Sequence, residues 1–190
     1  MPNLYIIAGC NGAGKTTASL TILPEILGCR EFVNADLIAY GLSPLNVTSV
    51  AFQAGRMMLH RMDELLAAEK DFAFETTLAT RHYVHLIEKA RKRGYETTLL
   101  YFWLHSPEQA RLRVAERVAK GGHHIEDAVV ERRYYRGIKN FFNLYSPVCD
   151  NWSLFDNTVG EPKLIAEGGK NYDVSIANVD VWNIIQKQTL

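Results

Sequence analysis

The chain has 190 residues, of which 47% are hydrophobic, and its 21 lysines and arginines balance 21 aspartates and glutamates. This length suits one domain over residues 1–190, and a net charge of zero disfavours nucleic acid and an anionic membrane as partners because there is no overall basic field. A signal-peptide pattern and a membrane-length apolar run are both missing, and the three cysteines are scattered, which together predict a cytoplasmic protein with reduced thiols.

The N-terminal segment carries the most informative pattern. Residues 4–8 form an apolar run typical of a β-strand, and residues 17–27 show a helical pattern that ends before Gly28. Between them lies a glycine-rich loop that meets every fixed position of the P-loop pattern. This strand, loop and helix predict that nucleotide phosphates are bound by Gly9, Asn11, Gly12, Ala13, Gly14, Lys15, Thr16 and Thr17.

The residue types in this loop have separate chemical tasks. The glycines allow backbone N–H groups to turn toward phosphates at the N-terminus of a helix, where the helix dipole favours negative charge. Lys15 is expected to reach the terminal phosphates, and the Thr16 hydroxyl is expected to bind Mg²⁺. The loop therefore predicts a nucleotide and Mg²⁺ as ligands.

Strand and helix patterns alternate along the rest of the chain, as expected of an α/β fold. Strand patterns cover residues 31–34, 72–74, 97–104 and 152–155, with edge strands at 164–167 and 172–176. Helical patterns cover residues 48–69, a segment that ends near 93, the segment 106–120, residues 126–142 and a short segment from 180. Residues 36–47, with Gly41 and Pro44, have the composition of a loop. The run 97–104 is apolar almost throughout and is expected beside the P-loop strand at the centre of a parallel sheet.

Acidic side chains follow two of the predicted strands. Asp36 follows the second strand, and Glu75 follows the third together with Thr76 and Thr77. Ligands of open parallel sheets bind beyond the carboxyl ends of the strands, so one carboxylate is predicted to activate a hydroxyl and the other to hold a polar acceptor. The alternatives are a helix cap for Asp36 and a solvent-facing strand end for Glu75.

A cluster of arginines lies on the two helices after the central strand, with a Gly-Gly-His-His segment at 121–124 between them as a candidate hinge. Its members are Arg113, Arg117, Arg132, Arg133 and Arg136. Arginines on a closing lid can stabilise the negative charge of a transferring phosphoryl group. The alternative is two solvated helix faces on which the arginines pair with Glu116 and Glu131.

Two absent motifs narrow the class of nucleotide-binding protein. The sequence has no apolar strand followed by Asp-Glu, as in motor ATPases, and no Leu-Ser-Gly-Gly-Gln signature of transporter ATPases. Both absences disfavour a machine ATPase. Mg²⁺ is then expected on Thr16, the phosphates and water, with Asp36 as a further candidate, which is more typical of a small kinase.

Taken together, six stretches of the chain resemble the zeta toxin-like P-loop kinases, especially their compact bacterial branch. They are residues 9–17, 34–36, 74–77, Arg117 with 121–123, 132–134, and 156–157. The resemblance implies a three-layer P-loop NTPase fold with a mainly parallel sheet, helices on both faces, the nucleoside-kinase-like strand order 2-3-1-4-5 and a helical lid at about residues 107–142. It also implies ATP and Mg²⁺ as cofactors.

The same resemblance implies roles for individual residues. They are Asp36 as the base, Glu75, Thr77 and Arg133 near the acceptor, Arg117 and Arg132 on the transferring phosphates, and Asn157 at the nucleotide. In zeta toxins the acceptor is a sugar hydroxyl of UDP-N-acetylglucosamine, and an antitoxin-like protein is the implied partner.

We therefore expect an ATP-dependent kinase that phosphorylates a hydroxyl group of a small molecule, with a nucleotide sugar as the favoured acceptor. One alternative is a nucleotide-binding switch or ATPase that acts through a partner. The other is a nucleic-acid end kinase, which zero net charge and the absence of a long basic, aromatic groove disfavour.

Overall fold

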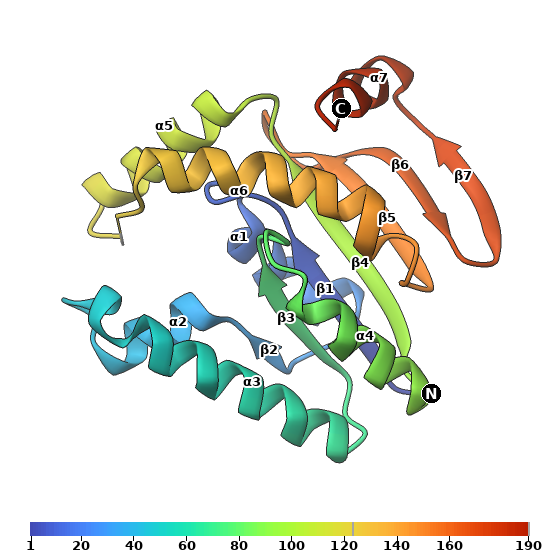
Figure 1. The fold of residues 1–190 in the computed structure, drawn as a ribbon, viewed down its shortest axis with the longest axis horizontal. Coiled ribbons are helices and arrows are strands. Elements are labelled where there is room, and N and C mark those ends of the chain that lie inside the picture. The colour runs from blue at the N-terminus through green and yellow to red at the C-terminus, as the bar shows by residue number, and fades with distance from the viewer. Residues whose placement is uncertain (123, 190) are drawn as a thin grey trace.

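A computed structural model describes residues 1–122 and 124–189, which are arranged around one seven-stranded sheet (Figure 1). The strands are β1 (Asn3–Ala8), β2 (Phe32–Val33), β3 (Phe72–Thr76), β4 (Glu96–Trp103), β5 (Asn151–Asp156), β6 (Lys163–Gly169) and β7 (Tyr172–Ile176). Their order in the sheet is β2-β3-β1-β4-β5-β6-β7. The first five strands pair in parallel and the last two are antiparallel, so the expected order 2-3-1-4-5 is confirmed.

The centre of the sheet is buried on both faces. β1 pairs with β3 on one side and β4 on the other, and Ile6 lies opposite both Phe74 and Leu99. These three side chains are fully buried. A parallel strand covered on both faces needs apolar side chains on both faces, which explains the continuous apolar runs of β1 and β4.

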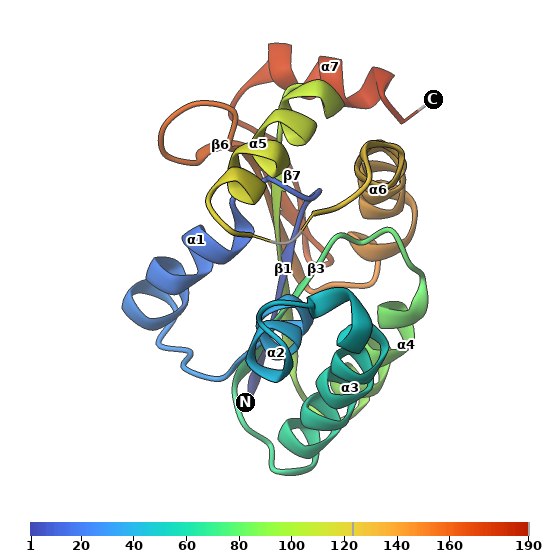
Figure 2. The ribbon, with the colours of Figure 1, turned by 90° about the vertical axis from the view of Figure 1, so that its left-hand side faces the viewer.

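Helices cover both faces of the sheet (Figure 2). The α-helices are α1 (Lys15–Thr21), α2 (Ala35–Leu42), α3 (Ala51–Ala67), α4 (His82–Lys92), α5 (Pro107–Ala119), α6 (Asp127–Asn140) and α7 (Val179–Lys187). Three irregular helical segments are η1 (Ile22–Ile26), η2 (Val47–Val50) and η3 (Phe141–Tyr145). In Figure 2, α1 and α5 lie on one side of the sheet and α3, α4 and α6 lie on the other.

The expected loop at residues 36–47 is wrong, because most of it is α2 and η2. Asn34 caps α2, and its Oδ1 accepts hydrogen bonds from the backbone N–H groups of Asp36 at 2.8 Å and Leu37 at 3.2 Å. An asparagine cap stabilises a helix start, and Gly41 is tolerated in the last turn. The helix expected at 17–27 is also broken, since α1 ends at Thr21 and a π-helical segment containing Pro24 follows.

The segment that we call the lid, residues 107–142, contains α5 and α6. Ser106 caps α5 as expected, since its side chain accepts a hydrogen bond from the N–H of Gln109 at 3.2 Å. α5 ends before Gly121, which has a positive φ of 87°. His123 of the expected hinge lies outside the described residues. In Figure 2 the two lid helices lie in the upper half of the view, and α2 and α3 lie in the lower half.

Candidate active site

The P-loop follows β1 and is held in place by the lid and by the loop after β5. Gly14 has a φ of 77°, and a Cβ atom there would lie 2.6 Å from Nδ2 of Asn157. Gly12 has a φ of 80°, and a Cβ atom there would lie 2.7 Å from the carbonyl oxygen of Ala110. Only glycine fits both the backbone conformation and the space at these two positions.

Asn157 is buried behind the P-loop. Its Nδ2 donates a hydrogen bond of 2.6 Å to the carbonyl oxygen of Ala13. In this structure Asn157 therefore supports the backbone of the loop, while its predicted contact with the nucleotide stays a prediction.

Lys15 is buried at the start of α1, and its ammonium group has two partners. Nζ donates a hydrogen bond of 2.9 Å to the carbonyl oxygen of Cys10 and lies 3.5 Å from Oε1 of Glu75. The side chains of Lys15 and Glu75 are 6% and 11% exposed. A buried cation of this kind is compensated by the carboxylate.

The Glu75 carboxylate, at the end of β3, contacts three polar side chains. Its Oε2 accepts hydrogen bonds from Thr16 Oγ1 at 2.7 Å and from Asn34 Nδ2 at 2.8 Å, in addition to the ion pair with Lys15. The carboxylate thus lies against the P-loop. Its predicted role near the acceptor is not tested by these contacts.

The oxygen atoms at this point suit a magnesium ion. Mg²⁺ prefers oxygen ligands and in kinases takes one or two from the protein and the rest from phosphates and water. The Thr16 hydroxyl and the Glu75 carboxylate provide that chemistry side by side. Within residues 1–122 and 124–189, no three His, Cys, Asp or Glu side chains gather in a way that could hold a metal. The residues present therefore fit Mg²⁺ held jointly by protein and nucleotide.

Two charged groups approach the P-loop from α2 and α6. Asp36 is exposed in the first turn of α2, and Arg133 of the lid donates a hydrogen bond of 3.1 Å to Oδ1 of Asn11. Burial lowers the pKa of Arg133, an effect that the nearby Asp36 carboxylate opposes.

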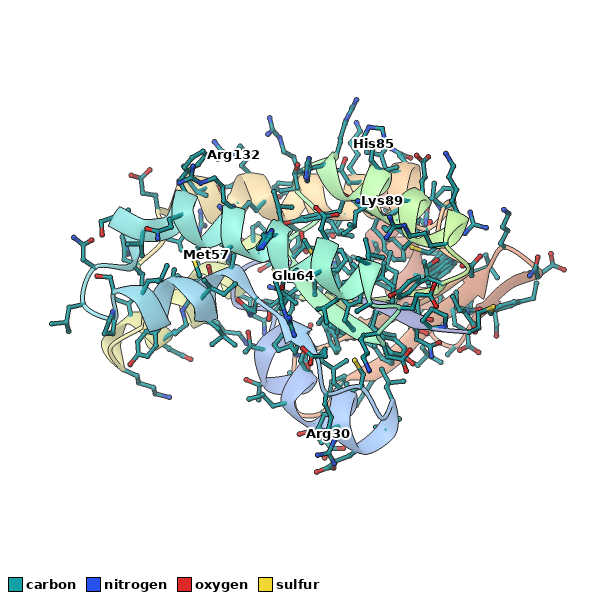
Figure 3. All side chains as sticks on the ribbon, turned by 90° about the horizontal axis from the view of Figure 1, so that it is seen from below. Arg30, Met57, Glu64, His85, Lys89 and Arg132 are labelled. Atoms are coloured by element: carbon teal, nitrogen blue, oxygen red, sulfur yellow. The ribbon has the colours of Figure 1, made fainter. Side chains whose placement is uncertain are left out.

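The other predicted lid arginines are placed differently. Arg117 lines the cavity in front of the P-loop and packs against Gly122. Arg132 is exposed on α6 (Figure 3), and neither Arg132 nor Arg133 lines this cavity. Adjacent residues on a helix point about 100° apart, so Arg132 and Arg133 cannot both face the P-loop.

The cavity has a volume of about 430 Å³ and lies between the P-loop, α2, the start of α3 and α5. Its lining includes Asn11, Gly12, Gly14, Lys15, Thr16, Asn34, Asp36, Leu37, Tyr40, Val47, Ala51, Glu75, Arg113 and Arg117. The wall from α2 and η2 is largely apolar, whereas the P-loop and lid walls are polar and basic. Predicted residues Thr17 and Thr77 do not line it: Thr17 is exposed on α1, and the hydroxyl of Thr77 accepts a hydrogen bond from the N–H of Ala79 at 3.5 Å.

Two residues of the site were not predicted as members. Asn34 joins α2 to Glu75, and the Asn-Ala-Asp sequence before a helix is a capping signal that could have identified it. Arg113 donates hydrogen bonds to the carbonyl oxygens of Thr158 at 2.8 Å and Gly12 at 3.5 Å. The sequence placed Arg113 in the arginine cluster but gave no reason to select it.

The sequence matches one protein family, and the fold is similar to that of several solved structures. The family model for the zeta toxin matches residues 43–143, which is more than half of the chain. The crystal structure of AvrRxo1-ORF1 with ORF2 and ATP is similar with a TM-score of 0.79 at 17% sequence identity, over 100% of this chain and 65% of that chain. The chain thus spans a little less than two thirds of the length of that protein.

Two further structures share the fold. The toxin of the PezAT toxin-antitoxin system of Streptococcus pneumoniae has a TM-score of 0.70 at 16% identity, over 99% of this chain and 78% of that chain. Shikimate kinase from Acinetobacter baumannii has a TM-score of 0.50 at 19% identity, over 98% of this chain and 92% of that chain. These likenesses show an α/β fold shared with P-loop kinases. Among the described residues, no helix has the length and apolar character needed to cross a membrane.

Proposed function

Because the chain belongs to the zeta toxin family, we propose that it is an ATP-dependent kinase that transfers the γ-phosphoryl group to a hydroxyl group of a small molecule. The observation that carries this proposal is the meeting of three elements at the P-loop. Glu75 from β3 accepts a hydrogen bond from Thr16, Arg133 from the lid donates one to Asn11, and Asp36 from α2 lines the same cavity as Asn11. Phosphoryl transfer depends mainly on positioning and on stabilising charge, and these groups can do both.

The P-loop side chains are assigned to the nucleotide. Lys15 exchanges its contacts with Cys10 and Glu75 for the terminal phosphates of ATP, whose charge it follows through the transfer. When bound, Mg²⁺ would be held by the Thr16 hydroxyl and, through water, by Glu75, and would neutralise charge on the β- and γ-phosphates. Glu75 therefore orders Lys15 and Thr16 before the nucleotide binds.

Asp36 and Arg133 are assigned to the reacting groups. Asp36 lies in the first turn of α2 and lines the cavity, so its carboxylate can accept the proton of an acceptor hydroxyl. Arg133 holds a positive charge beside Asn11 of the P-loop and is assigned to stabilise the negative charge of the transferring group. Arg117 lines the cavity from α5 and is assigned to the phosphates as well.

The acceptor is proposed to be a nucleotide sugar such as UDP-N-acetylglucosamine. Family membership supports it, and so does the apolar wall that Leu37, Tyr40 and Val47 give to the cavity, on which a flat ring can pack. An antitoxin-like protein is the proposed partner, by analogy with the PezAT system. The proposed location is the cytoplasm, where ATP is available.

A screen of acceptors tests this proposal. The protein is incubated with Mg²⁺ and ATP carrying a labelled γ-phosphate, together with nucleotide sugars, nucleosides, other small alcohols and oligonucleotides. We expect the label on a small molecule, most of all on a nucleotide sugar. Label on oligonucleotides alone would indicate a nucleic-acid end kinase, and label released only as free phosphate would indicate an ATPase or switch.

A further inference from the structure

One side chain of the C-terminal helix contacts the elements that carry the site. Gln188 caps the end of α7, and its Oε1 accepts a hydrogen bond of 3.1 Å from Nε1 of Trp103 at the end of β4. Its Nε2 donates a hydrogen bond of 3.4 Å to the carbonyl oxygen of His105. Helix α7 lies outside the residues matched by the zeta toxin model.

The same side chain reaches the lid helix α6. The hydroxyl of Tyr134 donates a hydrogen bond of 2.7 Å to the carbonyl oxygen of Leu104 and lies 3.1 Å from Oε1 of Gln188. Tyr134 is 1% exposed. Its ring and hydroxyl are therefore fixed between α6, the end of β4 and α7.

Tyr134 is the neighbour of Arg133 in sequence, and this links α7 to the site. Side chains of adjacent helical residues point about 100° apart, so the rotation of α6 that places Tyr134 against Gln188 also sets the direction of Arg133. In the structure this direction brings NH1 of Arg133 to 3.1 Å from Oδ1 of Asn11 in the P-loop.

A second contact between α7 and the lid lies at the far end of α6. The ring of Trp182 lies 5.5 Å from that of Phe142 in η3 and stacks on that of Trp152 in β5 with an interplanar angle of 9°. α7 thus holds the α6–η3 unit at two places, one apolar and one polar. Figure 2 shows α7 at the top of the molecule with its C-terminal end on the side of α6.

From these contacts we infer that Gln188 is a positioning residue for phosphoryl transfer: it fixes Tyr134, and through the rotation of α6 it aims Arg133 at the P-loop. This inference rests on the proposed kinase function only for its effect on turnover. Its structural part, the orientation of α6, stands independently of the reaction.

The test compares Gln188→Leu with Gln188→Glu and with Gln186→Leu. Leucine removes the hydrogen bonds at nearly the same size, and glutamate keeps an oxygen that accepts from Trp103. Gln186 lies on the same helix and its side chain takes no part in this network, so Gln186→Leu is the matched control. The free energy of unfolding is measured for each variant.

For Gln188→Leu we expect kcat to fall about tenfold or more while the KM for ATP stays within about twofold, because misplacing a charged group by about 1 Å costs rate rather than ground-state binding. Gln188→Glu should retain most of kcat, and Gln186→Leu should match the wild type. In a Tyr134→Phe background the Gln188→Leu change should cost little more, since both act through one contact. Equal kcat in Gln188→Leu and wild type, or additive losses in the double variant, would overturn the inference.

Hydrogen exchange separates this inference from the proposed function. We expect amides of residues 127–140 to exchange faster in Gln188→Leu than in wild type, and amides of α3 to be unchanged. This readout does not require turnover, so it decides the inference even if the acceptor screen shows no kinase. Unchanged exchange of α6 in Gln188→Leu would overturn it while leaving the kinase proposal intact.

Discussion

The hydroxyl of Thr16 donates a hydrogen bond of 2.7 Å to Oε2 of Glu75, which joins the P-loop to the end of the neighbouring strand. The same carboxylate lies 3.5 Å from Nζ of Lys15. Glu75 therefore compensates the charge of the P-loop lysine and lies next to the hydroxyl expected to bind Mg²⁺. These contacts favour a role for Glu75 at the metal and the phosphates over a role at the acceptor.

Replacing Glu75 by Gln should weaken the use of Mg²⁺. The variant keeps the size of the side chain and removes its charge, so we expect the Mg²⁺ concentration for half-maximal turnover to rise about tenfold, as is typical when a group supporting a metal site is lost. Titration of turnover with Mg²⁺ at fixed ATP measures this. Glu31→Gln removes an exposed carboxylate paired with Arg61 and should leave the requirement unchanged. An unchanged Mg²⁺ requirement with a raised KM for the acceptor would instead support the acceptor role predicted from the sequence.

Lys15→Ala should lower turnover by about 10²-fold or more, because the ammonium group stabilises charge that develops on the phosphates. The variant also leaves Glu75 without its buried cation, so thermal unfolding must be followed in parallel. Lys163→Ala, on the exposed start of β6, is the control. Normal phosphoryl transfer by folded Lys15→Ala protein would rule out the P-loop assignment.

Arg132 and Arg133 offer a matched pair on one helix. We expect Arg133→Ala to lower kcat by about 10²-fold, because its guanidinium lies at the P-loop and can stabilise the transferring group. Arg132 is exposed, and Arg132→Ala should change kcat by no more than about twofold, as for most surface substitutions. Steady-state kinetics with saturating acceptor measures both. If Arg132→Ala has the larger effect, the lid closes with a different face of α6 toward the phosphates.

Stability should depend on alkaline pH through a buried thiol. Burial raises the pKa of Cys149 from 9.0 to about 12. Above about pH 9 the unfolded chain loses this proton and the folded protein keeps it, so the free energy of unfolding falls with pH by up to about 1.4 kcal/mol per unit. Denaturant unfolding of reduced protein between pH 8 and 11 measures the slope, which Cys149→Ala should make shallower. Identical slopes for the two proteins would contradict the assignment.

Much of the fold could be predicted from local patterns. Residues 4–17 predict the P-loop because glycine adopts the left-handed backbone at positions 12 and 14 without steric cost, and the apolar run at 97–104 identifies the central strand. α2 was not recognised, because Gly41 and Pro44 are loop signals and they outweighed the capping signal of Asn34. The hydrogen bonds of the Asn34 cap favour a helix at this segment and its composition favours a loop, and the segment is a helix.

The sequence predicts which residues follow the strand ends and so lie near the site, but it does not predict which of their side chains contact one another. The sequence places Glu75 after β3, yet whether its carboxylate meets the P-loop or the acceptor depends on its side-chain rotamer and on Asn34. Arg132 and Arg133 are neighbours in sequence, and the rotation of α6 that distinguishes them is set by distant residues such as Gln188. Such tertiary information has no local signal.

We propose that Asp36 activates an acceptor hydroxyl for transfer from ATP, and γ-phosphate transfer by wild type and Asp36→Asn tests this role. Asparagine keeps the shape of the side chain and removes the base, which is typically worth about 10² to 10⁴ in rate. We expect labelled phosphate on a small-molecule acceptor to fall by that order in the variant, while ATP still binds through the P-loop. Transfer to no acceptor by the wild type, with equal ATP hydrolysis by Asp36→Asn, would contradict the claim and indicate a nucleotide switch.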